Sequence, residues 1–111
     1  MELLDLTDVP ERVLVVVAHP DDIDFAIAGT AAVLTAAGTK VTYALCTSGE
    51  AGIPEEMDRA ELAQIREREQ RAAAAQVGVT DVRFLGQPDG HLEANLELRK
   101  VISRVIRQVK P

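Results

Sequence analysis

The apolar residues of this chain form short strand-like segments that alternate with longer segments of helical periodicity. Val13 to Val17 is a continuous apolar run, which is typical of a parallel strand covered on both faces. Residues 40–46 place alternate apolar side chains on one face, as a strand does, and residues 82–85 form a third short apolar segment. The pattern therefore predicts three strands, over residues 13–17, 40–46 and 82–85.

The segments that follow these strands predict helices over residues 23–37, 57–77 and 92–109. Gly38 and Gly78 come directly after the first two segments, where glycine commonly ends a helix. An order of β-α-β-α-β-α favours right-handed crossovers and a parallel sheet. We expect an α/β fold, a Rossmann-like parallel sheet sandwiched by helices, with residues 1–111 as the N-terminal portion of one domain.

The point at which the sequence stops affects whether the first strand has a pairing partner on both edges. In a doubly wound sheet of this kind a fourth strand would pair beside the first, but the 111 residues stop after the third predicted helix. The first strand would then be an apolar edge that is open to pairing. We expect that the chain is truncated before the fourth strand, or that self-association through the first strand covers this edge.

Composition narrows the class of protein. Hydrophobic residues make up 47% of the chain and charged residues 27%, which is typical of a soluble globular domain. Aromatic residues make up only 3%, so we expect a core of Val, Leu, Ile and Ala. The formal charge of −6 and the lack of a basic patch argue against nucleic acid as a partner.

The chain shows no sign of export or membrane insertion. Its single cysteine, Cys46, cannot form an internal disulfide, which fits a reducing compartment. Residues 1–5 have neither the basic nor the apolar part of a signal peptide. The longest strongly apolar run, residues 13–18, is too short for a membrane span. We therefore expect a cytoplasmic protein.

The residues that carry candidate chemistry follow the first strand, in the sequence His19-Pro20-Asp21-Asp22. Ligands of parallel α/β sheets bind at the carboxyl ends of the strands. An imidazole and a carboxylate suit zinc, which lowers the pKa of a bound water to about 7, and a second carboxylate can act as general base. Alternatively, paired aspartates at a helix start are a common cap and the histidine is polar packing.

Several motifs together resemble the family of zinc-dependent N-acetylglucosaminyl deacetylases. This family includes N-acetylglucosaminyl-phosphatidylinositol deacetylases and the bacterial enzymes of mycothiol and bacillithiol synthesis. The motifs occur in family order over nearly the whole chain: Val-Val-Ala-His-Pro-Asp-Asp at 16–22, Gly29, Thr-Ser-Gly-Glu-Ala-Gly at 47–52, Arg-Glu-Arg-Glu at 66–69, Val-Gly-Val at 77–79 and Pro-Asp-Gly at 88–90.

The resemblance implies a role for five side chains. His19 and Asp22 would bind zinc, and Asp21 would be the general base that activates a zinc-bound water. Arg66 and Asp89 would bind sugar hydroxyls of a small glycoconjugate, whose acetamide would be hydrolysed to acetate and a free amine. Read without the family, Arg66 belongs to a solvated charged helix face and Asp89 is a turn former.

The sequence departs from the family in two places. Asp24 stands where the family usually has Glu, and the third zinc ligand, a histidine beyond the fourth strand, has no match. His91 lies in a turn and does not correspond to it. We therefore expect the 111-residue chain alone to be inactive. We expect Glu50 to orient its loop and Cys46 to be a small buried hydrophobe.

Two readings from other classes stay open. The chain could be a non-catalytic Rossmann-like binding domain, although it lacks the Gly-x-Gly-x-x-Gly of a dinucleotide site after the first strand. It could also be a remnant that only pairs with a partner through its open edge.

Overall fold

A computed structural model describes residues 8–52 and 56–111 of the chain. Residues 1–5, used above to argue against a signal peptide, and residues 53–55 of the loop after the second strand lie outside the described residues. The helices and strands, in chain order, are β1 (Arg12–Val17), α1 (Asp22–Ala26), α2 (Ala28–Ala36), β2 (Lys40–Leu45), α3 (Arg59–Gln76), β3 (Asp81–Phe84) and α4 (Leu96–Val109).

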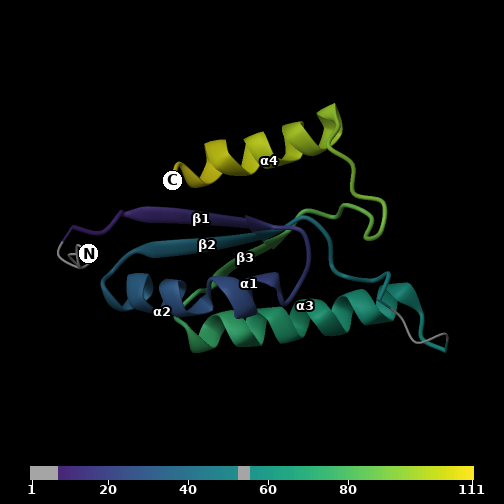
Figure 1. The fold of residues 1–111 in the computed structure, drawn as a ribbon, viewed down its shortest axis with the longest axis horizontal. Coiled ribbons are helices and arrows are strands. Elements are labelled where there is room, and N and C mark those ends of the chain that lie inside the picture. Colours follow the sequence, from purple (N-terminus) through teal and green to yellow (C-terminus); the bar gives the residue numbers. More distant parts are fainter. Residues whose placement is uncertain (1–7, 53–55) are drawn as a thin grey trace.

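The three strands form one parallel sheet in the order β1-β2-β3. Val13 of β1 pairs with Val41 of β2, and Tyr43 of β2 pairs with Val82 of β3. Helices α1, α2 and α3 lie on one face of the sheet and α4 lies on the other (Figure 1). The predicted α/β class, a parallel sheet sandwiched by helices, is confirmed.

The core is divided into two clusters by the sheet, because successive side chains of a strand point to opposite faces. On the α1–α3 side, Tyr43 is fully buried and is the largest of the buried side chains. On the α4 side, Ala44 packs with Val105 and Val109. The core is built mainly from aliphatic residues, as composition predicts, with one tyrosine at its centre: its other buried members on the α1–α3 side are Ile23, Ala31, Val41, Leu45, Ala74, Val79 and Val82.

Two helices differ from the expected segments. The segment 23–37 contains two helices, since Ile27 has φ −124° and ψ −20°, outside the helical range. The last helix begins at Leu96, four residues later than predicted, because Asn95 caps it by accepting a hydrogen bond of 3.0 Å from the Leu98 amide. Residues 92–95 therefore belong to the loop after β3.

The helix ends at Gly38 and Gly78 are as predicted. Both glycines follow the C-cap residue and have positive φ, +96° and +82°, the conformation that glycine adopts most easily. At Gly78 a Cβ atom would also lie 2.8 Å from the Thr35 hydroxyl. The end of α3 therefore packs closely against α2.

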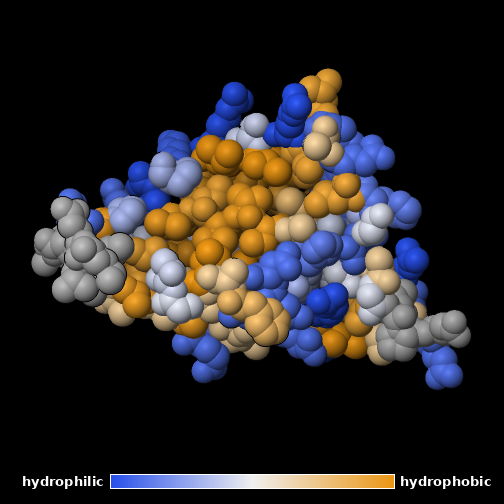
Figure 2. Space-filling view, in the orientation of Figure 1, coloured by the Kyte–Doolittle hydropathy of each residue, from blue (hydrophilic) through white to orange (hydrophobic). Residues whose placement is uncertain are grey.

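The β1 strand keeps one edge without a partner among the strands that the structure describes. Val16 of β1 is 38% exposed and Ile106 of α4 is also exposed. Figure 2 shows a continuous apolar area over β1 and the adjoining side of α4. Within the described residues, none of the helices has both the length and the apolar character needed to cross a membrane.

Candidate active site

The candidate site forms where β1 and β2 end side by side. The Ala18 carbonyl accepts two hydrogen bonds from Thr47, one from its amide at 3.0 Å and one from its hydroxyl at 2.9 Å. These bonds tie the residue before His19 to the residue that follows β2 by two positions. His19 is thereby held at the carboxyl edge of the sheet, where ligands of parallel α/β folds bind.

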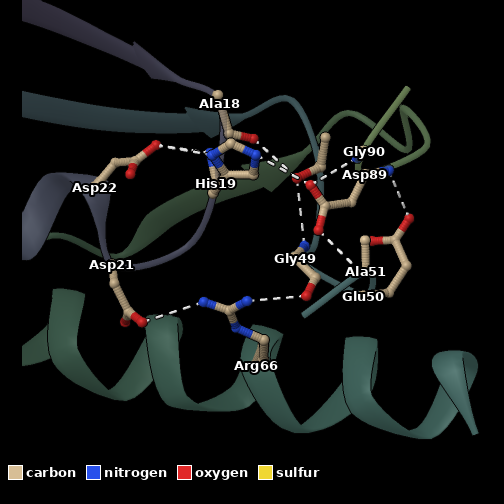
Figure 3. A network of polar contacts seen from close by, with 11 residues as sticks. Ala18, His19, Asp21, Asp22, Gly49, Glu50, Ala51, Arg66, Asp89 and Gly90 are labelled. Atoms are coloured by element: carbon tan, nitrogen blue, oxygen red, sulfur yellow. Dashed lines mark hydrogen bonds and ion pairs between the residues drawn. The ribbon is translucent and has the colours of Figure 1, made fainter. Parts of the chain in front are cut away.

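The His19 ring lies between two carboxylates (Figure 3). Its Nδ1 is 3.4 Å from Asp22 Oδ2, and its Nε2 is 3.0 Å from Asp89 Oδ1. The His19 amide also donates to Asp22 Oδ2 at 2.9 Å. The His19 and Asp22 side chains are 46% and 45% exposed, whereas that of Asp89 is 8% exposed. The ring therefore has an open side toward Asp22 and a closed side toward Asp89.

The open side offers two donors of a kind that zinc binds. If Nε2 carries the ring proton toward Asp89, Nδ1 presents a lone pair to the Asp22 carboxylate, so two acceptors face each other. Zinc binds histidine nitrogen and carboxylate oxygen of this kind, so His19 and Asp22 fit two of its ligands. Within residues 8–52 and 56–111, no group of three or more His, Cys, Asp or Glu side chains gathers to hold a metal.

Asp21, the candidate base, has a backbone conformation that is unusual for a non-glycine residue. Its φ is 75°, in the left-handed region, a conformation that costs about 1–3 kcal/mol and persists only where surrounding contacts hold it. Its amide donates to Gln70 Oε1 at 2.9 Å, and its Oδ2 accepts from Arg66 Nη2 at 3.2 Å. Asp21 occupies the N-cap position of α1 but makes no side-chain cap, so the capping alternative does not describe it.

Arg66 joins this aspartate to the loop after β2. Its second nitrogen, Nη1, donates to the Gly49 carbonyl at 2.9 Å (Figure 3). Gly49 has φ +70°, and a Cβ atom there would collide with the Arg66 guanidinium. The Arg66 side chain is therefore held by contacts to Asp21 and Gly49 and is only 24% exposed, while Glu69 on the same helix is exposed.

Asp89 joins the loops after β2 and β3. Its Oδ2 accepts from the Ala51 amide at 2.9 Å and its Oδ1 from the Gly90 amide at 3.0 Å. Its own amide donates to Glu50 Oε1 at 2.9 Å. Glu50, which from the sequence is expected to orient its own loop, therefore also connects that loop to the loop after β3.

The chain is similar to known proteins in sequence and in fold. The family described as "PIG-L: GlcNAc-PI de-N-acetylase" matches residues 14–111. The chain belongs to this family. The chain is also 36% identical, over 106 residues and 90% of its length, to a probable N-acetyl-alpha-D-glucosaminyl L-malate deacetylase 2 from Bacillus anthracis.

Two solved structures also resemble the chain. One is the N,N'-diacetylchitobiose deacetylase of Pyrococcus horikoshii, with a TM-score of 0.87 and 32% identity over 91% of the chain. The other is the 4-carboxy-2-hydroxymuconate hydratase GalB of Pseudomonas putida, with a TM-score of 0.82 and 27% identity over 92% of the chain.

The chain covers only part of these relatives and solved structures. It covers 47% of the Bacillus protein, and 38% and 45% of the two solved chains. The chain thus spans about half the length, or less, of the proteins it matches.

Gln70 is the site residue of this PIG-L chain that sequence reasoning missed. Gln70 is 1% exposed. Its Oε1 accepts a hydrogen bond from the Asp21 amide, and its Nε2 donates one to Asp24 Oδ1 at 3.4 Å. Its position four residues after Arg66 places it on the same face of the helix, and this spacing could have indicated from the sequence that Gln70 lies near the site. Asp24, where the family usually has Glu, therefore contacts α3 and not the His19 ring.

Two further residues lie apart from this network. His91 is exposed, and its amide donates to the Pro88 carbonyl at 3.3 Å. Cys46 is buried, and desolvation raises the pKa of its thiol, which disfavours the thiolate needed for metal binding or attack. The expectation that Cys46 is a small buried hydrophobe is confirmed.

Gln70 provides a test of how α3 holds Asp21. We expect Gln70→Leu to lower the free energy of unfolding by about 1–3 kcal/mol, because the Asp21 amide and the Asp24 carboxylate lose their partner. Gln64→Leu, at an exposed position of the same helix, is the matched control and should change it by less than about 0.5 kcal/mol. Urea unfolding followed by circular dichroism measures both, and equal losses would contradict the role of Gln70.

Proposed function

We propose that this chain provides two zinc ligands, His19 and Asp22, and the general base, Asp21, of a zinc-dependent hydrolase. We call the two ligands the metal corner. The enzyme would remove the N-acetyl group from an N-acetylglucosamine-type glycoconjugate. The observation that carries the proposal is the His19 ring held between Asp22 and Asp89, beside Asp21, in a chain of the PIG-L family. Relatives named as deacetylases of such substrates support the substrate class.

The roles follow from how the side chains are held. His19 Nδ1 and Asp22 Oδ2 would hold the metal on the open side of the ring. Zinc, when bound, polarises the amide carbonyl and lowers the pKa of water at its open position. Asp21 is exposed and adjacent, so it can accept the proton of the attacking water as general base. The ion pair with Arg66 fixes the direction of this carboxylate.

Arg66 and Asp89 are the proposed contacts for sugar hydroxyls. A guanidinium has five N–H donors, and two nitrogens of Arg66 each use one toward Asp21 and Gly49. Donors therefore remain for a substrate hydroxyl. Asp89 borders the other side of His19 and could accept from a hydroxyl. A small glycoconjugate that reaches both would place its acetamide over the metal corner.

We also propose that the 111 residues alone are not a working enzyme. A catalytic zinc has three protein ligands and one open position, and the described residues bring together two. The single cysteine, which cannot form an internal disulfide, is the basis for proposing that the protein works in the cytoplasm.

The base assignment can be tested in a chimera. Residues 14–111 would replace the matching segment of the Pyrococcus horikoshii deacetylase, and acetate release from N,N'-diacetylchitobiose would be measured with zinc. We expect activity from the chimera, none from the chain alone, and a loss of about 10²–10⁴-fold on Asp21→Asn. Asp81→Asn, at the opposite end of the sheet, is the control and should retain activity.

The outcomes separate the alternatives. Activity that survives Asp21→Asn undiminished rejects Asp21 as the base. A folded chimera that takes up no zinc favours a non-catalytic binding domain.

GalB gives a specific reason for a second candidate, a hydratase that adds water to an unsaturated carboxylate. This reaction also activates water, so the same side chains could serve it. A zinc-loaded chimera that releases no acetate but bleaches the absorbance of a conjugated carboxylate would favour it.

We further propose that the chain self-associates through β1. The strand is apolar and one edge has no partner among the described strands, an arrangement that promotes pairing with another chain. Sedimentation velocity of the 111-residue chain should show a dimer or larger species, and Val16→Lys should shift it to monomer. Val33→Lys, an equally exposed valine on α2 (45% against 38% for Val16), should not. A wild-type monomer would overturn the proposal.

A further inference from the structure

Asp89 is the one buried acidic or basic residue among those the structure describes, at 7% exposed. A carboxylate out of water is costly unless hydrogen bonds and charges compensate it. No element of the core requires a charge at this point, since the turn after β3 could be closed by a neutral residue. We therefore look to the contacts of the Asp89 carboxylate for the reason that a charged residue is buried here.

The carboxylate is fixed by backbone groups before it meets the histidine. The amides of Ala51 and Gly90 donate to its two oxygens, and its own amide is held by Glu50. These partners come from the loops after β2 and β3 (Figure 3). Asp89 thus presents Oδ1 to His19 Nε2 at 3.0 Å from a rigid position.

We propose that Asp89 is a positioning residue that sets the ring orientation and proton placement of His19. With the ring proton on Nε2 and directed to Asp89, the lone pair of Nδ1 points to the open side, at Asp22. Outer carboxylates of this kind fix the tautomer and orientation of metal-binding histidines and raise their basicity. The metal corner is then preformed by three segments, the ends of β1, β2 and β3.

This inference rests on the proposed function, because positioning His19 matters only if His19 binds zinc. The first test of the inference does not need zinc. It also differs from a role in sugar binding alone. A residue that only binds a hydroxyl affects KM and leaves metal affinity unchanged, whereas a residue that positions His19 affects metal affinity without any substrate present.

The first measurement needs no metal. In the ¹⁵N-labelled, metal-free chain, we expect His19 to show a ring N–H proton on Nε2 that is protected from exchange at about pH 8. The chain has two histidines, so exposed His91 is an internal control and should show no protected signal. In Asp89→Asn the protected ring N–H signal of His19 should be lost, while the backbone amide spectrum should remain that of a folded protein. A missing signal in the wild type, or one unchanged in Asp89→Asn, overturns the inference.

The second measurement is zinc affinity of the same chain by chelator competition. We expect Asp89→Asn to bind zinc about 10–100-fold more weakly, and Asp81→Asn, remote from the site, to bind as the wild type does. Equal affinity of Asp89→Asn and wild type overturns the positioning role while the proposed function stands. A folded chimera that takes up no zinc, while the wild-type chain shows the protected ring proton, rejects the proposed function and keeps the positioning role.

Discussion

The site depends on the two hydrogen bonds that Thr47 donates to the Ala18 carbonyl. The bond from the amide continues the parallel pairing of β1 and β2 beyond the last residues of both strands, and the bond from the hydroxyl adds a side-chain contact to the same carbonyl. Because this carbonyl belongs to the residue before His19, the bonds fix where the backbone leaves the sheet. The position of every residue in the His19–Asp22 segment follows from that exit point, as do its contacts with α3 and with the turn after β3.

A second constraint is the concentration of negative charge at this edge. Asp22 and Asp89 lie on either side of one imidazole, and the neighbouring Asp21 pairs with the Arg66 guanidinium. Backbone amides supply the remaining compensation for Asp89. The negative charge of Asp22, beside the open side of His19, has the fewest positive or hydrogen-bonding groups around it. This is what a site that binds a cation requires.

The unusual backbone of Asp21 links the site to the fold. A left-handed aspartate is held by contacts from α3, which is distant in sequence. A helix that was only a scaffold would have no need of a buried glutamine facing the site. The inward face of α3 therefore serves both to cover the sheet and to hold the candidate base in place.

Much of the fold could be predicted from the sequence because its signals are local. The Val13–Val17 run and the glycines after α2 and α3 marked strand and helix boundaries to within a few residues. The break at Ile27 and the late start of α4 were missed, since they depend on a backbone angle and on the Asn95 cap.

The candidate site was predictable in part. His19 and Asp22 are close in sequence, and the resemblance to the deacetylase family pointed to Asp89. Gln70 and the loop contacts of Arg66 were not predictable, because they depend on how α3 packs across the sheet. The metal roles themselves stay predictions.

The central claim is that His19 is the anchor of a metal corner on this chain. Isothermal titration of zinc into the wild type, His19→Gln and His91→Gln tests it most directly, because the two histidines are the only ones present. The account predicts one zinc per wild-type chain, with binding abolished by His19→Gln and retained by His91→Gln. Zinc binding that survives His19→Gln, or that requires His91, would contradict it.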